Sequence, residues 1–274
     1  MEDECKPILN TGLRGVVIAD TRISDVQGAA GKLIYRGYLI QDLANNSSFE
    51  EVAYLLLFEK LPTAPELKAF KEQLAAEREI PPEVVSALKT RPKNALVMDI
   101  LQAGVSLLAH HDPDITDQTQ EAAVRMAIRL IAKFPTVLAA WDRIRNGKDP
   151  LSPSPDLDHA ANFLYMLKGE VPDEEEARFM DTCLVLHAEH SFNASTFAAR
   201  EIASTRAHMY AAVAGAVGSL SGELHGGANT RVMEMLTDVT HVYQLQEHLA
   251  SLGLMIGSVS HGIKGLLTGL DGGL

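Results

Sequence analysis

The chain has 274 residues, 46% hydrophobic and 5% aromatic, enough to bury a sizeable core in one large domain or in a large and a small one. Lys and Arg total 24 against 36 Asp and Glu, and this formal charge of −12 argues against a nucleic-acid-binding protein and against a protein that adheres to membranes. Cys5 and Cys183 are too few for a disulfide framework, the first residues are acidic rather than leader-like, and no apolar run reaches the ~20 residues of a membrane span. We therefore expect a cytoplasmic protein.

Strand-forming residues are concentrated near the beginning of the chain. Residues 15–19, 21–24 and 32–35 are short runs rich in Val, Ile and Thr, separated by Asp and Gly. They predict a small β hairpin or meander.

From Tyr38 onward, apolar residues recur at three- and four-residue spacing, which predicts a helical body. Several predicted starts carry capping pairs, such as Ser48 with Glu51. Pro135 should kink the longest helix. The predicted helices span 38–45, 48–59, 64–78, 82–89, 95–110, 117–146, 157–167, 174–188, 193–204, 207–220 and 229–237.

Composition divides the chain into two unequal parts. Residues 1–236 have the pattern of one large helical domain, in which 193–204 and 207–220 are rich in small residues that allow close packing in a core or against a second copy. Residues 251–274 hold seven glycines, so 237–274 read as the incomplete or divergent start of a small domain.

Two local constellations could carry chemistry. In the first, residues 186–196 read LHAEHSFNAST, and His187 and His190 share one face at a helix end. That spacing resembles a pair of metal ligands, but a zinc site needs a third protein ligand, and no flanking Cys or second HxxH provides one. Histidines that simply pack at a helix end are the plainer interpretation, and we predict no metal.

The second constellation is LHGGAN at residues 224–229, where His225 leads through two glycines into the predicted helix 229–237. Paired glycines let a ligand approach the backbone closely. A helix N-terminus disfavours the imidazolium, so a neutral ring there could polarise a carbonyl while an enol forms. A helix-capping turn with an incidental histidine is the alternative.

The order and spacing of these two segments resemble the citrate synthase family, whose members show an HxxHxxNAST-like segment followed some thirty-five residues later by a GPLHGGAN-like one. Five further segments look like family segments in family order: 12–17, 33–38, 48–57, 144–147 and 159–166. The resemblance covers roughly residues 12–236. It implies an all-α, multi-helical large domain behind the short β hairpin or meander, and a homodimer.

The resemblance also implies a reaction, in which acetyl-CoA condenses with oxaloacetate to citrate and CoA, with propionyl-CoA and 2-methylcitrate as the nearest variation. His225 matches the histidine that hydrogen-bonds the thioester carbonyl and stabilises the enol. His190 matches a histidine that holds oxaloacetate, Asn193 orients His225 or substrate, and His187 is mostly structural. The CoA thioester is a substrate, and no cofactor is required.

The family's small-domain residues have no clear match. The family has a GHRVYK-like motif, then an aspartate base and carboxylate-binding arginines; here SVSHGIK at 258–264 offers only His261 as a second catalytic candidate, and a glycine-rich segment of unrelated origin is the alternative. We therefore expect weak or no synthase activity from this chain alone. Two other functions stay open: a non-catalytic helical dimerisation module, and an HxxH metallohydrolase that uses His187, His190 and His225.

Overall fold

The computed structural model describes residues 19–223, 225 and 226, and the structural description concerns these residues. The predicted strand 15–19 (apart from Ala19), the predicted helix 229–237, His261 and the predicted domain boundary at 236 lie outside them. No described helix combines the length and the apolar character needed to cross a membrane.

The described chain opens with an antiparallel three-stranded meander of β1 (Ser24–Gln27), β2 (Lys32–Tyr35) and β3 (Tyr38–Leu39). The prediction of a meander is confirmed, but the first strand begins three residues later than the predicted start at Thr21. The reason is register: Gln27 pairs with Lys32 and Ser24 with Tyr35, so residues 21–23 lie beyond the paired part of β2. Tyr38, predicted to begin a helix, instead pairs with Tyr35.

The rest of the described chain is helical, and the predicted helices within it are confirmed, with starts within three residues of those expected. The capping box of Ser48 and Glu51 is present, and Thr63 with Glu66 forms a second one. The helices are α1 (Ile40–Asn46), α2 (Phe49–Phe58), α3 (Ala64–Ala76), α4 (Pro82–Lys89), α5 (Val97–Leu108), α6 (Gln120–Arg145), α7 (His159–Lys168), α8 (Glu174–His187), α9 (Ala194–Ser204) and α10 (Met209–Leu220).

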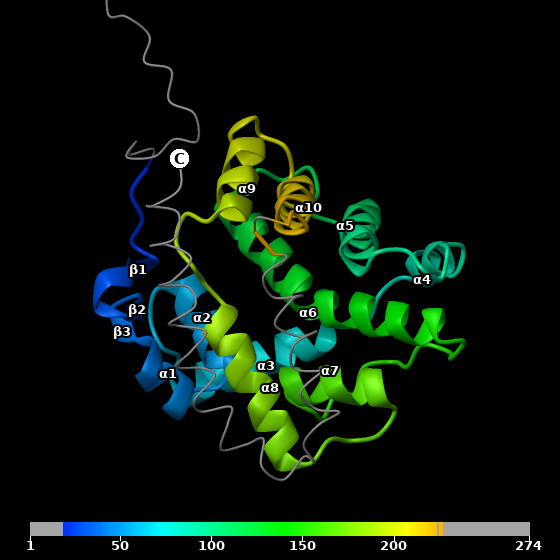
Figure 1. Ribbon diagram of the computed structural model, residues 1–274, viewed down its shortest axis with the longest axis horizontal. Helices are drawn as coiled ribbons and strands as arrows, with labels where there is room; N and C mark the ends of the chain where they lie inside the picture. Colours follow the sequence, from blue (N-terminus) through cyan, green and yellow to red (C-terminus); the bar gives the residue numbers. More distant parts are fainter. Residues whose placement is uncertain (1–18, 224, 227–274) are drawn as a thin grey trace, which may run out of the picture.

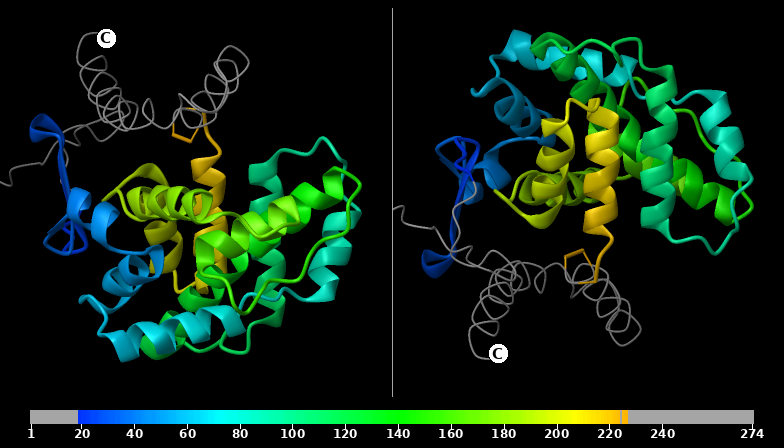
Figure 2. Two further views of the ribbon diagram at one scale, coloured as in Figure 1. Left: turned by 90° about the horizontal axis from the view of Figure 1, so that it is seen from below. Right: turned by 90° about the horizontal axis from the view of Figure 1, so that it is seen from above.

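The longest helix, α6, is the centre of the molecule and remains one helix through Pro135. Figure 1 shows that it changes direction along its length, as a proline that removes one backbone hydrogen bond predicts. The sheet and α1 lie at one end of the molecule, and α4 and α5 lie at the other (Figures 1 and 2).

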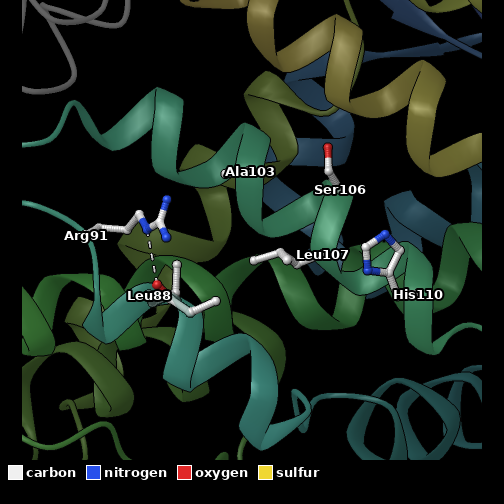
Figure 3. Close-up of a pocket in the computed structure, with 7 residues that line it drawn as sticks. Leu88, Arg91, Ala103, Ser106, Leu107 and His110 are labelled. Atoms are coloured by element: carbon white, nitrogen blue, oxygen red, sulfur yellow. Dashed lines mark hydrogen bonds between the residues drawn. The ribbon is translucent and has the colours of Figure 1, made fainter.

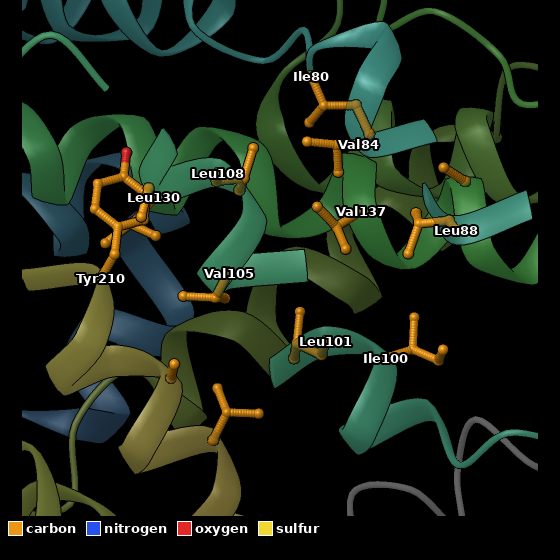
Figure 4. Close-up of a cluster of buried hydrophobic side chains, with 14 of the residues drawn as sticks. Ile80, Val84, Leu88, Ile100, Leu101, Val105, Leu108, Leu130, Val137 and Tyr210 are labelled. Atoms are coloured by element: carbon orange, nitrogen blue, oxygen red, sulfur yellow. The ribbon is translucent and has the colours of Figure 1, made fainter. Parts of the chain in front are cut away.

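The main hydrophobic core lies between α4, α5, α6 and α10, where Leu88, Val105, Val137 and Tyr210 meet (Figure 4). The single tryptophan, Trp141, is fully buried in it. A second cluster joins the sheet to α2 and α8 through Tyr35, Leu55 and Val185. The three-stranded sheet is thus packed against α8, the helix that ends at the HxxH segment.

Helix α10 packs between α5 and α9 (Figures 1 and 2). By contrast with α10, α9 has no buried residue. One face of α9 therefore has no covering layer within the described chain.

Candidate active site

The predicted HxxH segment forms the end of α8 and the loop that follows. His187 is the last residue of α8, and its Nδ1 lies 2.7 Å from the carbonyl oxygen of Cys183, one turn earlier. Because a carbonyl can only accept, Nδ1 carries the proton and the ring caps its own helix. This contact agrees with a structural role for His187.

Asn193 is the N-cap of α9. Its Oδ1 accepts the backbone N–H of Thr196 at 2.8 Å, which satisfies one of the free donors at the start of the helix. The same oxygen accepts the hydroxyl of Ser195 at 2.7 Å. Asn193 thus fixes the position of the Ser195 hydroxyl as well as the first turn of the helix.

His225 lies half-buried against this first turn, thirty residues away in sequence. Its Nε2 is 3.0 Å from Ser195 Oγ and 3.3 Å from the backbone nitrogen of Ser195. The histidine therefore meets the positive end of α9, whereas the helix 229–237 at whose start it was predicted to lie is outside the described residues.

The two contacts to Ser195 couple the tautomer of His225 to a hydroxyl. When Nε2 carries no proton, it accepts the backbone N–H of Ser195 and the ring proton is on Nδ1. When Nε2 is protonated, it donates to Ser195 Oγ, which donates to Asn193 Oδ1. In both arrangements a neutral ring has a protein partner for one nitrogen and leaves the other for a ligand.

The turn that contains His225 requires a glycine at position 226. The backbone N–H groups of His225 and Gly226 both donate to the carbonyl of Gly222 at 3.0 Å. A Cβ at Gly226 would lie 2.0 Å from the carbonyl oxygen of Leu220. Gly226 is therefore needed for the close approach of its own chain, while ligand access to the glycine pair remains a prediction because Gly227 lies outside the described residues.

Comparisons with known proteins show the family of this chain. Residues 12–253 match the family described as "Citrate synthase, C-terminal domain". The chain belongs to the citrate synthase family. It is 45% identical over 249 residues to the citrate synthase of Acidithiobacillus ferridurans, covering 89% of this chain and 64% of that one. It is 42% identical over 234 residues to the 2-methylcitrate synthase of Mycobacterium tuberculosis, covering 85% and 59%.

Solved structures of the family confirm the mostly helical citrate synthase-like fold. The citrate synthase of Pyrobaculum aerophilum aligns with a TM-score of 0.80 and 39% identity over 87% of this chain and 61% of that one. That of Thermoplasma acidophilum, a ternary complex with carboxymethyl coenzyme A and oxaloacetate, aligns with a TM-score of 0.75 and 30% identity over 78% and 56%. The chain thus spans about three fifths of the relatives it matches.

Within this citrate synthase fold, the predicted site residues form one linked group and one separate residue. Asn193 and His225 are joined through Ser195. His190 lies on the same loop as Asn193, is exposed, and forms no hydrogen bond to another described residue. His261, the second catalytic candidate, is outside the described residues.

Sequence reasoning missed Ser195, which contacts His225, and Glu189, which contacts Tyr35 and Ser191. Ser195 could have been found from the N-cap run of Asn193, Ser195 and Thr196, since such residues bond among themselves at a helix start. Glu189 lies inside the HxxH segment and its carboxylate accepts the nearby backbone N–H of Ser191, but its contacts with Tyr35 and Ser24 join residues far apart in sequence, which no local signal marks.

Nothing among the described residues supports the metallohydrolase alternative. No group of three or more His, Cys, Asp or Glu side chains there is placed to hold a metal ion. His225 faces Ser195, and His187 bonds its own helix.

A groove of about 300 Å³ lies elsewhere, between α4 and α5 (Figure 3). Its wall includes Leu88 and Leu107, with Arg91 and His110 at its rim. Because none of the candidate site residues lines it, we do not place the reaction there.

Proposed function

We propose that the chain is a citrate synthase-type acyltransferase, which condenses acetyl-CoA with oxaloacetate to citrate and CoA. The observation that carries the proposal is His225 held by Ser195 at the N-terminus of α9, within a family match that covers most of the chain. The Thermoplasma acidophilum structure, which is similar to this chain, contains oxaloacetate and a CoA analogue.

His225 would act as the acid. With its Nε2 accepting the permanent backbone donor of Ser195, the neutral ring carries its proton on Nδ1 and donates it as a hydrogen bond to the thioester carbonyl oxygen. That bond strengthens as the oxygen gains charge during enol formation, which lowers the barrier. The enol carbon then attacks the keto carbon of oxaloacetate, the keto oxygen takes a proton, and water cleaves the thioester to release CoA.

His190 and Asn193 would serve the substrate side. The exposed ring of His190 is available to hydrogen-bond an oxaloacetate oxygen, and Asn193 holds Ser195 in place behind His225. The base that removes the methyl proton belongs to the family's small domain. We place the start of that domain after residue 236, with His261 as its candidate histidine outside the described residues, while the aspartate base and the carboxylate-binding arginines of the family have no clear match in this chain.

The test is release of CoA thiol from acetyl-CoA and, separately, from propionyl-CoA in the presence of oxaloacetate. Two proteins are compared: this chain, and a chimera in which residues 237–274 are replaced by the corresponding segment of the Acidithiobacillus ferridurans enzyme. We expect release by the chimera, lost in its His225→Gln variant and kept in its His187→Gln variant. A folded chimera without release from either thioester contradicts the proposal.

The second candidate function is a helical dimerisation module, and one observation favours it. Helix α9 has no buried residue, so one of its faces is open to a second copy. A homodimer through this layer is part of both proposals. Analytical ultracentrifugation that finds only monomer, alone and with a complete synthase, would exclude the module.

A further inference from the structure

We propose that Tyr35 and Glu189 are positioning residues that together set the place of His190. The proposal rests on the proposed function, because it concerns the histidine that would hold oxaloacetate. It comes from contacts between the small sheet and the loop after α8, which no motif in the sequence connects.

Tyr35 holds the backbone directly before His190. The side chain of Tyr35 is fully buried on β2, and its hydroxyl donates to the carbonyl oxygen of Glu189 at 2.8 Å. The same hydroxyl accepts the backbone N–H of Glu189 at 3.2 Å. One side chain thus fixes both peptide groups of Glu189, including the one that joins it to His190.

The hydroxyl is a dependable donor. Burial raises the pKa of Tyr35 to about 12, so the phenol stays protonated across the physiological pH range. Tyr38, its paired neighbour on β3, is exposed and serves as a matched comparison.

The carboxylate of Glu189 holds the backbone directly after His190. Its two oxygens accept the backbone N–H of Ser191 at 2.9 and 3.0 Å. Ser191 has a φ of +57°, a left-handed conformation that is unfavourable for a residue with a Cβ. The charge-assisted bonds compensate this strain, and Ser24 on β1 adds a third bond, from its hydroxyl to Oε1 at 3.0 Å.

His190 is therefore held on both sides while its own ring stays exposed. Neither Tyr35 nor Glu189 needs to touch a substrate for this effect. Loss of either contact would let the loop leave its left-handed turn and carry the imidazole with it.

The experiment uses the full chain with Tyr35→Phe, Glu189→Ala and, as the matched control, Tyr38→Phe. Amide hydrogen exchange at Ser191 and the NMR resonances of the His190 ring report the loop, and Trp141 fluorescence during urea unfolding reports global stability. We expect Ser191 to exchange roughly 10- to 100-fold faster in the first two variants, with shifted His190 resonances and unchanged loop signals in Tyr38→Phe. In Glu189→Asp, Ser191 should exchange faster than in the wild type, because the aspartate side chain is one carbon shorter than that of glutamate.

Two results would overturn the proposal: unchanged Ser191 exchange and His190 resonances in both variants, or faster exchange that follows a matching global loss of stability. The readout is independent of turnover. Oxaloacetate added to the wild-type chain distinguishes the two proposals, because His190 resonances that do not respond to it count against the proposed function alone, whereas the loop measurements decide the positioning role.

Discussion

The interior around Asp112 and the loop around His190 are both built from charged and polar groups, but the Asp112 side chain is buried and the His190 side chain is exposed. The Asp112 carboxylate is fully buried and receives two bonds from Arg129, at 2.7 Å each, and one from Tyr210. His190 is exposed and bonds no described residue, although the residues on either side of it are held. Around Asp112 the charged and polar side chains bond one another, whereas the candidate site fixes the backbone and leaves the side chain of His190 for a ligand.

The largest expected effect is in the interior. Burial alone would raise the pKa of Asp112, but bonds from Arg129 and Tyr210 outweigh it and hold that pKa below its usual value. Arg129→Leu leaves this buried carboxylate without its cation, so we expect the free energy of unfolding to fall by about 3–5 kcal/mol. Urea unfolding followed by Trp141 fluorescence measures it.

The matched control for that prediction is Lys68→Leu. Lys68 and Glu72 form an ion pair with most of both side chains exposed, and such pairs contribute less than about 1 kcal/mol. If Arg129→Leu were no more destabilising than Lys68→Leu, the contrast between interior and surface would be wrong.

A second interior effect depends on pH. His159 is buried, and desolvation lowers its pKa from 6.5 to about 3, with a smaller contribution from Arg78. Below pH 6.5 the unfolded chain takes up a proton that the folded chain does not, so acid destabilises the fold. Between pH 7 and pH 5 this residue should lower the free energy of unfolding by about 2 kcal/mol.

His159→Phe should remove that part of the pH dependence, since it keeps an aromatic ring beside Phe49 and the backbone N–H that Glu50 accepts. Urea unfolding at pH 7 and pH 5 compares it with the wild type and with His111→Phe, a change at an exposed histidine. Equal pH dependence in His159→Phe and wild type would contradict the prediction.

Two helical glycines allow the packing of the main core to be compared with the packing between α9 and α10. A Cβ at Gly104 would lie 2.7 Å from Cγ1 of Val137, a fully buried and stiff side chain. A Cβ at Gly215 would meet Cδ1 of Ile202 at 2.2 Å, but this methyl ends a half-buried side chain on α9, a helix with no buried residue, and can rotate.

We expect Gly104→Ala to destabilise the fold by about 1–2 kcal/mol through overpacking. Gly215→Ala should change stability by less than about 1 kcal/mol, because alanine's higher helix propensity offsets the movement of Ile202. Thermal unfolding of both variants decides this, and an equal or larger loss for Gly215→Ala would show that the α9 layer is packed as rigidly as the core.

The smallest effect on stability is expected in the site. Ser195→Ala removes the hydroxyl next to His225 but keeps the backbone donor, so stability should change by less than about 0.5 kcal/mol. The ¹⁵N resonances of the His225 ring should shift, with the proton on Nδ1. Ser204→Ala on the same helix, whose hydroxyl bonds the carbonyl of Glu201, is the control. Unaltered His225 resonances in Ser195→Ala would exclude the coupling between ring and hydroxyl.

The sequence alone determined the features that depend on neighbours along the chain. Helix limits follow from apolar spacing and from caps such as Ser48 with Glu51, which act within one turn. The candidates His190, Asn193 and His225 were also identified from short segments. Their roles remain predictions, because family motifs name residues without showing their contacts.

Only the tertiary structure decided which distant groups meet. The Ser195–His225 contact spans thirty residues, and the Tyr35–Glu189 contact spans 154. The meander register and the close approach at Gly226 are likewise set by backbone geometry. Such contacts follow from how helices and strands pack in space, and a pattern that repeats every three or four residues marks the buried face of a helix but not the distant element that covers it.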